Sequence, residues 1–494
     1  MSINKHIENI KKAQVEIEKK KPLIKDAKMR QRYHFMAEEG WINDPNGLIF
    51  FNNRYHFFYQ YNPYDSFWGA MHWGHAVSSD LVNWEYLPIA LAPSEPYDEH
   101  DRGGCFSGSA IEHEGKLYLI YTGTTNYGDG FIQTQCLAWS EDGVNFIKYE
   151  NNPIIKAPEG YEEGNFRDPK VWKHGEYFYL VCGAKKDNLA KALLYRSKDL
   201  KNWEFFNVLA ESRGELGYMW ECPDFYPIGN KFVLMFSPMG LHERTTVYLV
   251  GDLNYETGKF HYTTSGEIDW GFDFYAPQSF QDNKGRRLIA GWANAWDWMP
   301  WWKDWGPSFK ENWCGAFGLI REVKLCDDNT LMFVPVEEYN VLRSNEQELK
   351  DIAVSGSKYE LKAGDGVAFE LQMLIDLEKT TCSSFQLLLR CSESKQSVIT
   401  FDLKTSEMTF DRNNSDGWSK GISRSPLILK NKEFLDIHVF ADQSSIEIFT
   451  DNYQTVHSCN VFAGNDQNNN YISANDRVLA IKSFKSWGLS KDTK

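Results

Sequence analysis

The sequence has no long apolar run and no excess of basic residues. No stretch of its 494 residues is long and apolar enough to cross a bilayer, and residues 1–30 carry charges throughout, without a signal-peptide core. The net charge of -15 argues against a basic surface of the kind that binds nucleic acids or anionic membranes. We therefore expect a soluble, cytoplasmic protein that has neither a nucleic acid nor a membrane as its partner.

The sequence also lacks any paired cysteine motif. Its nine cysteines are scattered, with no CxxC pair and no spacing typical of a zinc site. We expect reduced, mostly buried thiols, and we expect neither a metal nor an organic cofactor.

Residues 3 to 28, rich in lysine and glutamate, predict a helix that is broken near Pro22, and VEEYNVLRSNEQELKD after about Val336 predicts a polar, partly helical connector. From Tyr33 onward, short runs of alternating aromatic and β-branched residues are bounded by Gly, Asn, Asp and Pro, which predicts an all-β chain. Aromatic residues make up 15% of the composition and tryptophan alone contributes 18 residues, which suits both hydrophobic cores and surfaces that stack on sugars.

Five similar units follow one another in the first two thirds of the chain. They are DPNGLIFFNNRYHFFYQY, SGSAIEHEGKLYLIYTG, DPKVWKHGEYFYLVCG, CPDFYPIGNKFVLMFS and APQSFQDNKGRRLIAGW. A period of about 40 to 55 residues is typical of a β-propeller, in which the innermost strands surround a central funnel. We predict an N-terminal helical extension (1–30), a five-bladed β-propeller (31–336), a linker (337–351) and a C-terminal β-sandwich (352–494).

Three acidic residues lie near the starts of these units. Asp44 in WINDPNG and Asp168 in FRDPK directly precede a proline, whereas Glu221 in WECPD lies two residues before one, so its alignment is looser. Each acid taken alone is explained by an ordinary turn. Three acids at the start of propeller strands predict carboxylates that converge on one funnel, which is what glycoside hydrolysis requires.

These motifs, together with YHFFYQYNP, WGHAVSSDLVNWEYLPIAL and GGCFSGSA, resemble glycoside hydrolase family 32, which includes invertases, fructanases and sucrose-6-phosphate hydrolases. The resemblance covers residues 31 to 335 and extends more weakly into the sandwich through ADQSSIEIFTDN. It implies a retaining β-fructofuranosidase in which Asp44 is the nucleophile, Glu221 is the general acid/base and Asp168 binds fructose hydroxyls. In that mechanism Asp44 is ionised and Glu221 protonated before the reaction.

The resemblance also implies a set of substrate-binding residues, namely Trp41, Asn43, Gln60, Trp68, Phe106, Ser107, Arg167 and Trp292. We expect the positive charge of Arg167, beside Asp168, to keep nearby carboxylates ionised and to orient them. A simple ion pair that stabilises the propeller is the alternative for this arginine.

Other chemistry-bearing residues receive structural interpretations. His72 and His75 are expected to be hydrogen-bonded structural imidazoles, and Cys222 to pack beside Glu221. Most tryptophans of the segment 292–313 are expected to pack the last blade or the interface with the sandwich. Lys303 and Lys310 in that segment could reach a phosphate on glucose, although solvated lysines are the default.

Three other functions remain open from the sequence. A related five-bladed hydrolase of arabinan or xylan uses a similar set of acids, a fructosyltransferase shares the first half of the reaction, and a silent sugar-binding propeller would lack at least one acid. The expected partner is a small sugar. The expected absence of a secretion signal favours an imported, phosphorylated disaccharide over an extracellular polymer, but the sequence alone does not rank sucrose, sucrose 6-phosphate and short fructans, nor does it set the oligomeric state.

Overall fold

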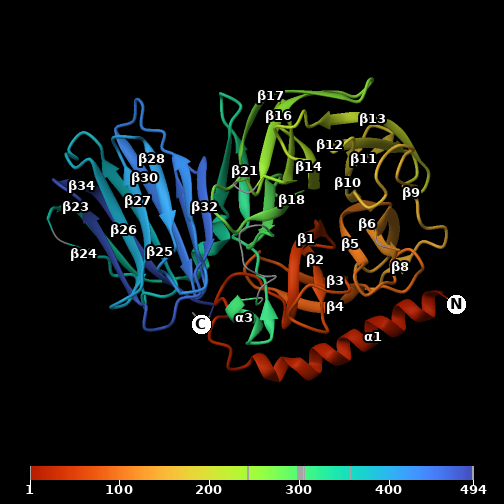
Figure 1. Cartoon of the computed structure of the whole chain (residues 1–494), viewed down its shortest axis with the longest axis horizontal. Coiled ribbons are helices and arrows are strands. Elements are labelled where there is room, and N and C mark those ends of the chain that lie inside the picture. The colour runs from red at the N-terminus through yellow and green to blue at the C-terminus, as the bar shows by residue number, and fades with distance from the viewer. Residues whose placement is uncertain are drawn as a thin grey trace.

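The computed structural model describes residues 2–128, 130–241, 244–296, 304, 306–356 and 358–491. Two β-rich units lie side by side, and a long helix runs beneath the first of them (Figure 1). Among the described residues, no helix has the length and apolar character needed to span a membrane.

The first unit contains five sheets, each built from strands that are consecutive or nearly consecutive in the chain. The first sheet contains β1 (Gly40–Phe51), β2 (Arg54–Asn62), β3 (His72–Ser78) and β4 (Glu85–Leu91), and the second contains β5 (Gly104–His113), β6 (Lys116–Tyr127), β7 (Gly130–Ser140), β8 (Ile147–Lys148) and β9 (Ile155–Lys156). The third contains β10 (Phe166–His174), β11 (Tyr177–Lys186), β12 (Leu189–Ser197) and β13 (Trp203–Glu211), and the fourth contains β14 (Met219–Ile228), β15 (Lys231–Met239), β16 (Val247–Asn254) and β17 (Lys259–Glu267). The fifth contains β18 (Tyr275–Gln281), β19 (Arg287–Trp292), β21 (Arg321–Leu325) and β22 (Leu331–Pro335).

These five sheets are the blades of a closed propeller. Their first strands contact one another in the order β1, β5, β10, β14 and β18, and β18 contacts β1 again. The ring is also fastened by the short strand β20 (Trp313–Cys314), which follows β19 in the chain and pairs in parallel with β1 of the first blade. The predicted five-bladed propeller is confirmed.

The second unit is a sandwich of two six-stranded sheets, as predicted. One sheet contains, in spatial order, β23 (Arg343–Val354), β34 (Leu479–Leu489), β25 (Phe369–Asp376), β30 (Phe434–Asp442), β31 (Ser445–Thr450) and β32 (Thr455–Asn460). The other contains β24 (Tyr359–Glu360), β33 (Asn469–Ala474), β26 (Ser384–Cys391), β27 (Ser397–Asp402), β28 (Glu407–Asp411) and β29 (Ile422–Pro426). Their inner faces enclose an aliphatic and aromatic core that includes Phe369, Leu371 and Phe401.

The predicted linker 337–351 is a connector only in its first part. A 3-10 helix, η2, occupies Glu337–Leu342, and strand β23 begins at Arg343 and pairs with β34. Residues from Asn345 to Asp351 are exposed because β23 is the edge strand of its sheet. An edge strand with charged side chains lacks the apolar alternation that marks a strand in a sequence.

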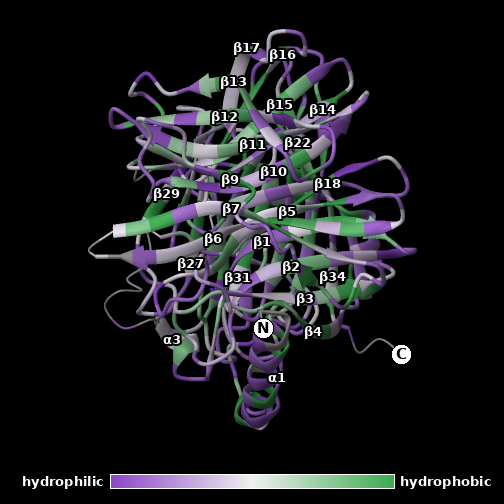
Figure 2. Ribbon diagram, turned by 90° about the vertical axis from the view of Figure 1, so that its right-hand side faces the viewer, coloured by the Kyte–Doolittle hydropathy of each residue, from purple (hydrophilic) through white to green (hydrophobic). Residues whose placement is uncertain are grey.

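Helix α1 (Ser2–Lys20), followed by the 3-10 turn η1 (Lys21–Ile24), covers the outer edge of the first blade. Ala13 and Ile17 are buried against the propeller, and Gln14 Oε1 accepts the backbone N–H of Ile89 in β4 at 3.1 Å. Figure 2 shows α1 as a largely hydrophilic helix below β3 and β4. The helix therefore blocks an edge that is otherwise open to pairing with another strand.

A buried cluster of charges joins blade five to the sandwich. Arg321 on β21 donates to Asp269 at 2.9 Å and to Glu447 on β31 at 2.7 Å. His34 bridges Asp442 (2.8 Å) and Glu447 (3.0 Å) of the sandwich. Burial alone would lower the pKa of His34, but these two carboxylates raise it to about 9. The imidazole therefore adds a second positive charge to the cluster, beside that of Arg321.

Candidate active site

All five inner strands carry an irregularity at the same height. The shifts in pairing lie between Ile42 and Pro45 in β1, Phe106 and Gly108 in β5, Arg167 and Lys170 in β10, Glu221 and Asp224 in β14, and Tyr275 and Gln278 in β18. A β-bulge redirects the side chains of a strand. The fold therefore directs side chains from all five strands into one funnel.

The bulges explain the looser alignment of Glu221. Asp168 and Cys222 each precede a proline and have positive φ angles of 66° and 48°. Asp44 and Asp168 thus hold the position directly before the proline, whereas Glu221 holds the preceding position, which is shared with Arg167 and Tyr275. Two adjacent positions of the repeat supply the chemistry of the site.

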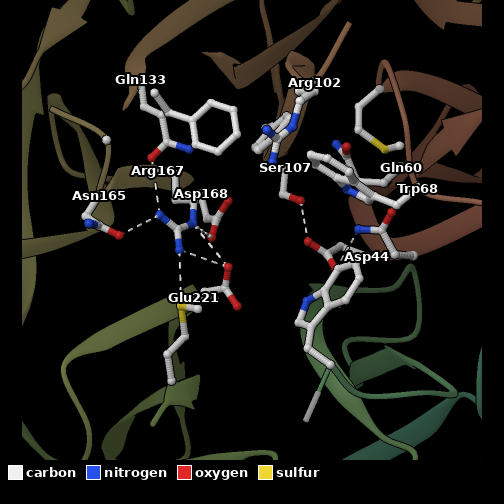
Figure 3. A pocket seen from close by; sticks show the side chains of 17 residues that line it. Asp44, Gln60, Trp68, Arg102, Ser107, Gln133, Asn165, Arg167, Asp168 and Glu221 are labelled. Carbon is white, nitrogen blue, oxygen red and sulfur yellow. Dashed lines mark hydrogen bonds and ion pairs between the residues drawn. The ribbon is translucent and has the colours of Figure 1, made fainter. Parts of the chain in front are cut away.

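The funnel contains a cavity of about 480 Å³, within the size range of small-molecule sites. It is lined by nine of the predicted site residues, namely Asn43, Asp44, Gln60, Trp68, Phe106, Ser107, Arg167, Asp168 and Glu221. In Figure 3, Asp44 lies on one side of the cavity, and Arg167, Asp168 and Glu221 lie on the other. A substrate in this cavity has carboxylates on both sides.

Asp44 is held by three neutral groups. Ser107 Oγ donates to its Oδ2 at 2.6 Å, Cys222 Sγ lies 3.5 Å from the same oxygen, and Asn43 Nδ2 donates to Oδ1 at 3.1 Å. Burial raises the pKa of Asp44 to about 6; the Ser107 hydrogen bond opposes this rise and the charge of Glu221 adds to it. At pH 7 the ionised form therefore still prevails by roughly ten to one.

Glu221 is held by Arg167 and Tyr275. Arg167 Nε and Nη2 donate to Glu221 Oε1 at 3.2 and 3.0 Å, and the Tyr275 hydroxyl donates to Oε2 at 2.5 Å. Arg167 lies beside Asp168, as predicted, with its Nε 3.9 Å from Asp168 Oδ2, and the carboxylate that it orients by hydrogen bonds is that of Glu221. On the other side of the guanidinium, Arg167 Nη1 donates to Gln133 Oε1 and to Asn165 Oδ1.

The pKa of Asp168 is raised further than that of Asp44. Burial raises its pKa to about 7; Arg167 opposes the rise, and the charges of Glu221 and Asp44 add to it. The backbone N–H of Cys222 donates to Asp168 Oδ2 at 2.9 Å. Because its pKa is about 7, Asp168 retains a proton in a large share of molecules near neutral pH.

Two predicted substrate contacts lie behind the cavity wall. Trp41 and Trp292 are completely buried and do not line the cavity. Trp41 Nε1 donates to Asn43 Oδ1 at 2.8 Å, and both indoles pack against Trp296, which does line the cavity. Both indoles are fully packed between the first and the last blade, so they do not reach the cavity as predicted. They support Asn43 and Trp296 instead.

Several residues of the site were not predicted from the sequence. Tyr275 holds the repeat position of Glu221 and Arg167, so aligning the units on their prolines would have found it. Gln133, Phe131 and Arg102 line the cavity from strand β7 and from the loop before β5. These three lie outside the repeated motifs, and no local signal in the sequence marks them.

Two histidines of strand β3 and two lysines near the end of the propeller lie outside the cavity lining or outside the described residues. His75 is fully buried, with its Nε2 3.0 Å from His56 Nδ1, and His72 Nδ1 lies 3.0 Å from the carbonyl oxygen of Ala70. Both are structural, as predicted. Lys310 is exposed and does not line the cavity, and Lys303 lies outside the described residues. Within the described ranges, no cluster of His, Cys, Asp and Glu side chains has the arrangement of a metal site.

Comparisons with known proteins agree with this geometry. The model of the glycosyl hydrolases family 32 N-terminal domain matches residues 34–335, and the model of the family 32 C-terminal domain matches residues 338–488. A sucrose-6-phosphate hydrolase from Zymomonas mobilis is 37% identical over 483 residues, which cover 92% of this chain and 91% of that protein.

Two solved structures are similar over nearly the whole chain. A β-fructofuranosidase from Bombyx mori, solved as a variant in complex with sucrose, has a TM-score of 0.81 and 32% identity, with coverage of 97% of this chain and 98% of that one. A sucrose-6-phosphate hydrolase from Lactobacillus gasseri has a TM-score of 0.84 and 28% identity, with coverage of 96% of both chains.

Proposed function

The chain belongs to glycosyl hydrolase family 32 and is a β-fructofuranosidase, and on that premise we propose that it hydrolyses sucrose and sucrose 6-phosphate with retention of configuration. The observation that carries this proposal is the pair of oppositely placed carboxylates, Asp44 on one wall and Glu221 on the other. Their hydrogen-bond partners differ, which suits two different roles.

In the first step, an oxygen of ionised Asp44 bonds to the anomeric carbon of the fructosyl group. The bond from that carbon to the glycosidic oxygen breaks, and Glu221 gives its proton to the departing oxygen. Arg167 and Tyr275 then stabilise the carboxylate that Glu221 becomes, because both donate hydrogen bonds to it.

In the second step, the Glu221 carboxylate takes a proton from water as the water oxygen bonds to the anomeric carbon. The ester bond to Asp44 breaks, and fructose leaves with the configuration that it had in the substrate.

The proton needed for the first step is supplied by the carboxylate cluster. Burial raises the pKa of Asp168 to about 7, against the opposing charge of Arg167, so Asp168 holds a proton in a large share of molecules at neutral pH. We expect a bound sugar, whose hydroxyls donate to Asp168, to favour transfer of that proton to Glu221. Asp168 therefore binds fructose hydroxyls through its Oδ1, because its Oδ2 accepts the N–H of Cys222.

A reducing compartment is the expected location. All nine cysteines lie in the described part of the chain, and all are free. Free, mostly buried thiols are typical of proteins in the cytoplasm.

The test is the release of fructose from sucrose, sucrose 6-phosphate and kestose by the protein and by Asp44→Asn and Glu221→Gln. Asp44→Asn should lower kcat/KM by at least about a thousandfold, because an amide cannot form the ester intermediate. Glu221→Gln should lower it by about a hundredfold to ten-thousandfold, the usual contribution of a general acid.

Matched controls are Asp252→Asn and Glu204→Gln, which make the same changes at exposed ion pairs on blades four and three. These controls should retain full activity. If the unmodified protein released no fructose, the proposal would be contradicted. An arabinan-type hydrolase or a silent binder would then be favoured. Oligosaccharides as the main products at high sucrose would instead identify a fructosyltransferase.

A further inference from the structure

Arg102 lies at the rim of the active-site cavity, where its positive charge is paired with no carboxylate of the described residues. Its side chain is exposed and lines the cavity, and within the described ranges it makes no ion pair and no side-chain hydrogen bond. The other cationic lining residue, Arg167, is bound to Glu221. Figure 3 shows Arg102 above the gap between Asp44 and the group that contains Glu221. Among the cavity-lining residues that the structure describes, Arg102 is therefore the cation that remains available to a ligand.

The loop that carries Arg102, residues 92–103, is firmly anchored. Asp98 is fully buried and accepts two backbone N–H groups of the loop at 2.9 Å each and Lys148 Nζ at 2.6 Å. The loop ends where Met71 N–H donates to the carbonyl oxygen of Gly103 at 2.9 Å. A group on such a loop binds a ligand without ordering its own backbone first, which favours binding.

Helix α1 contributes to the same anchor. Asn9 Nδ2 donates to the carbonyl oxygen of Pro93 at 2.8 Å, and Lys5 forms an exposed ion pair with Glu99. The N-terminal helix thus supports the loop beneath Arg102, besides covering the edge of the first blade.

The charges of the cavity determine where a substrate phosphate can lie. The floor contains Asp44, Asp168 and Glu221 against the single charge of Arg167, so a phosphate dianion there would meet net repulsion. The chain as a whole carries a net charge of -15 and disfavours anionic ligands elsewhere too. Within the part of the cavity that the structure describes, a phosphate is therefore best accommodated at the rim, on the half of the substrate farther from the acids.

We propose that Arg102 binds the phosphate of sucrose 6-phosphate through its guanidinium and so sets a preference for this substrate over sucrose. This inference rests on the proposed function, which places the fructosyl group against the acids and the glucosyl group, with its phosphate, toward the rim. Guanidinium groups suit phosphate because their N–H donors match two phosphate oxygens at once. The phosphate role that the sequence suggested for Lys310 is thereby transferred to Arg102, since Lys310 does not line the cavity.

The test is the ratio of kcat/KM for sucrose 6-phosphate to kcat/KM for sucrose. Arg102→Gln should lower this ratio tenfold to a hundredfold, the loss expected for a hydrogen-bonded charge pair. Arg102→Lys, which keeps the charge but loses the fork of donors, should lower it by less than Arg102→Gln. Lys310→Gln is the matched control at an exposed cation outside the cavity and should leave the ratio unchanged. Glucose 6-phosphate, used as an inhibitor of sucrose cleavage, should lose potency relative to glucose in Arg102→Gln by a similar factor.

An unchanged ratio in Arg102→Gln would overturn the assignment, and so would an equal loss on both substrates, because that would make Arg102 a general sugar contact. Either result leaves the proposed function intact, since the unmodified protein would still release fructose. Failure of the unmodified protein to release fructose from either substrate would instead overturn the proposed function itself.

Discussion

The hydroxyl of Ser107 controls the charge of Asp44. It donates to Asp44 Oδ2 at 2.6 Å, and this hydrogen bond favours the ionised carboxylate. Ser107→Ala should therefore raise the pKa of Asp44 above its value of about 6. Since the first step requires ionised Asp44, the acidic limb of the kcat/KM profile for sucrose should move to higher pH, by about one unit.

Ser109→Ala is the control for this prediction. Ser109 is buried on the same strand, β5, but its hydroxyl donates to the carbonyl oxygen of Pro169 at 2.8 Å and not to a catalytic acid. Its acidic limb should stay in place. An acidic limb that stays in place, or moves to lower pH, in Ser107→Ala would contradict the role of Asp44 as the group that must be ionised.

At the residue scale, the sequence predicted the side chains that lie in repeated motifs. Asp44, Asp168 and Glu221 all line the cavity, because the repeat places them on inner strands. It did not distinguish a residue that lines the cavity from one that supports the wall, and so Trp41 and Trp292 were both misplaced. That distinction depends on packing between blades, which motif spacing does not contain.

At the scale of elements, the buried cluster around Arg321 fastens blade five to the sandwich. Its guanidinium neutralises Asp269 and Glu447, which are both buried. Arg321→Met should lower the free energy of unfolding by about 3 to 5 kcal/mol, because it leaves these carboxylates without their cation. Thermal unfolding at pH 7 measures this loss.

The comparison variant is Arg424→Met, which breaks the exposed pair with Glu407 on the sandwich surface. It should cost at most about 1 kcal/mol, since exposed ion pairs contribute little. Equal losses in the two variants would show that the buried cluster does not hold the units together.

The elements themselves were predicted where one face of a strand is apolar. The inner strands alternate aromatic and β-branched residues, and all five were found. The edge strand β23 was predicted as a linker because charged, exposed residues fill its middle. The bulges were not predicted either, because the prolines that mark four of them also suit ordinary turns.

At the scale of the whole molecule, the propeller supplies the chemistry and its accessory parts hold it in shape. The five inner strands direct their side chains into one cavity, the sandwich is locked to blade five, and α1 supports both the edge of blade one and the loop that carries Arg102. The order of these parts could be predicted from the repeat. Their contacts with one another could not, because they join residues far apart in the chain, such as Asn9 and Pro93, 84 positions apart, and Arg321 and Glu447, 126 positions apart.

The central claim is that cleavage passes through a fructosyl-enzyme on Asp44. The measurement that tests it most directly is NMR of the fructose formed in the first seconds of sucrose hydrolysis, before the released sugar mutarotates. Two displacements at the anomeric carbon predict β-fructofuranose as the first product. α-Fructofuranose as the first product would mean a single displacement by water, and would contradict the account.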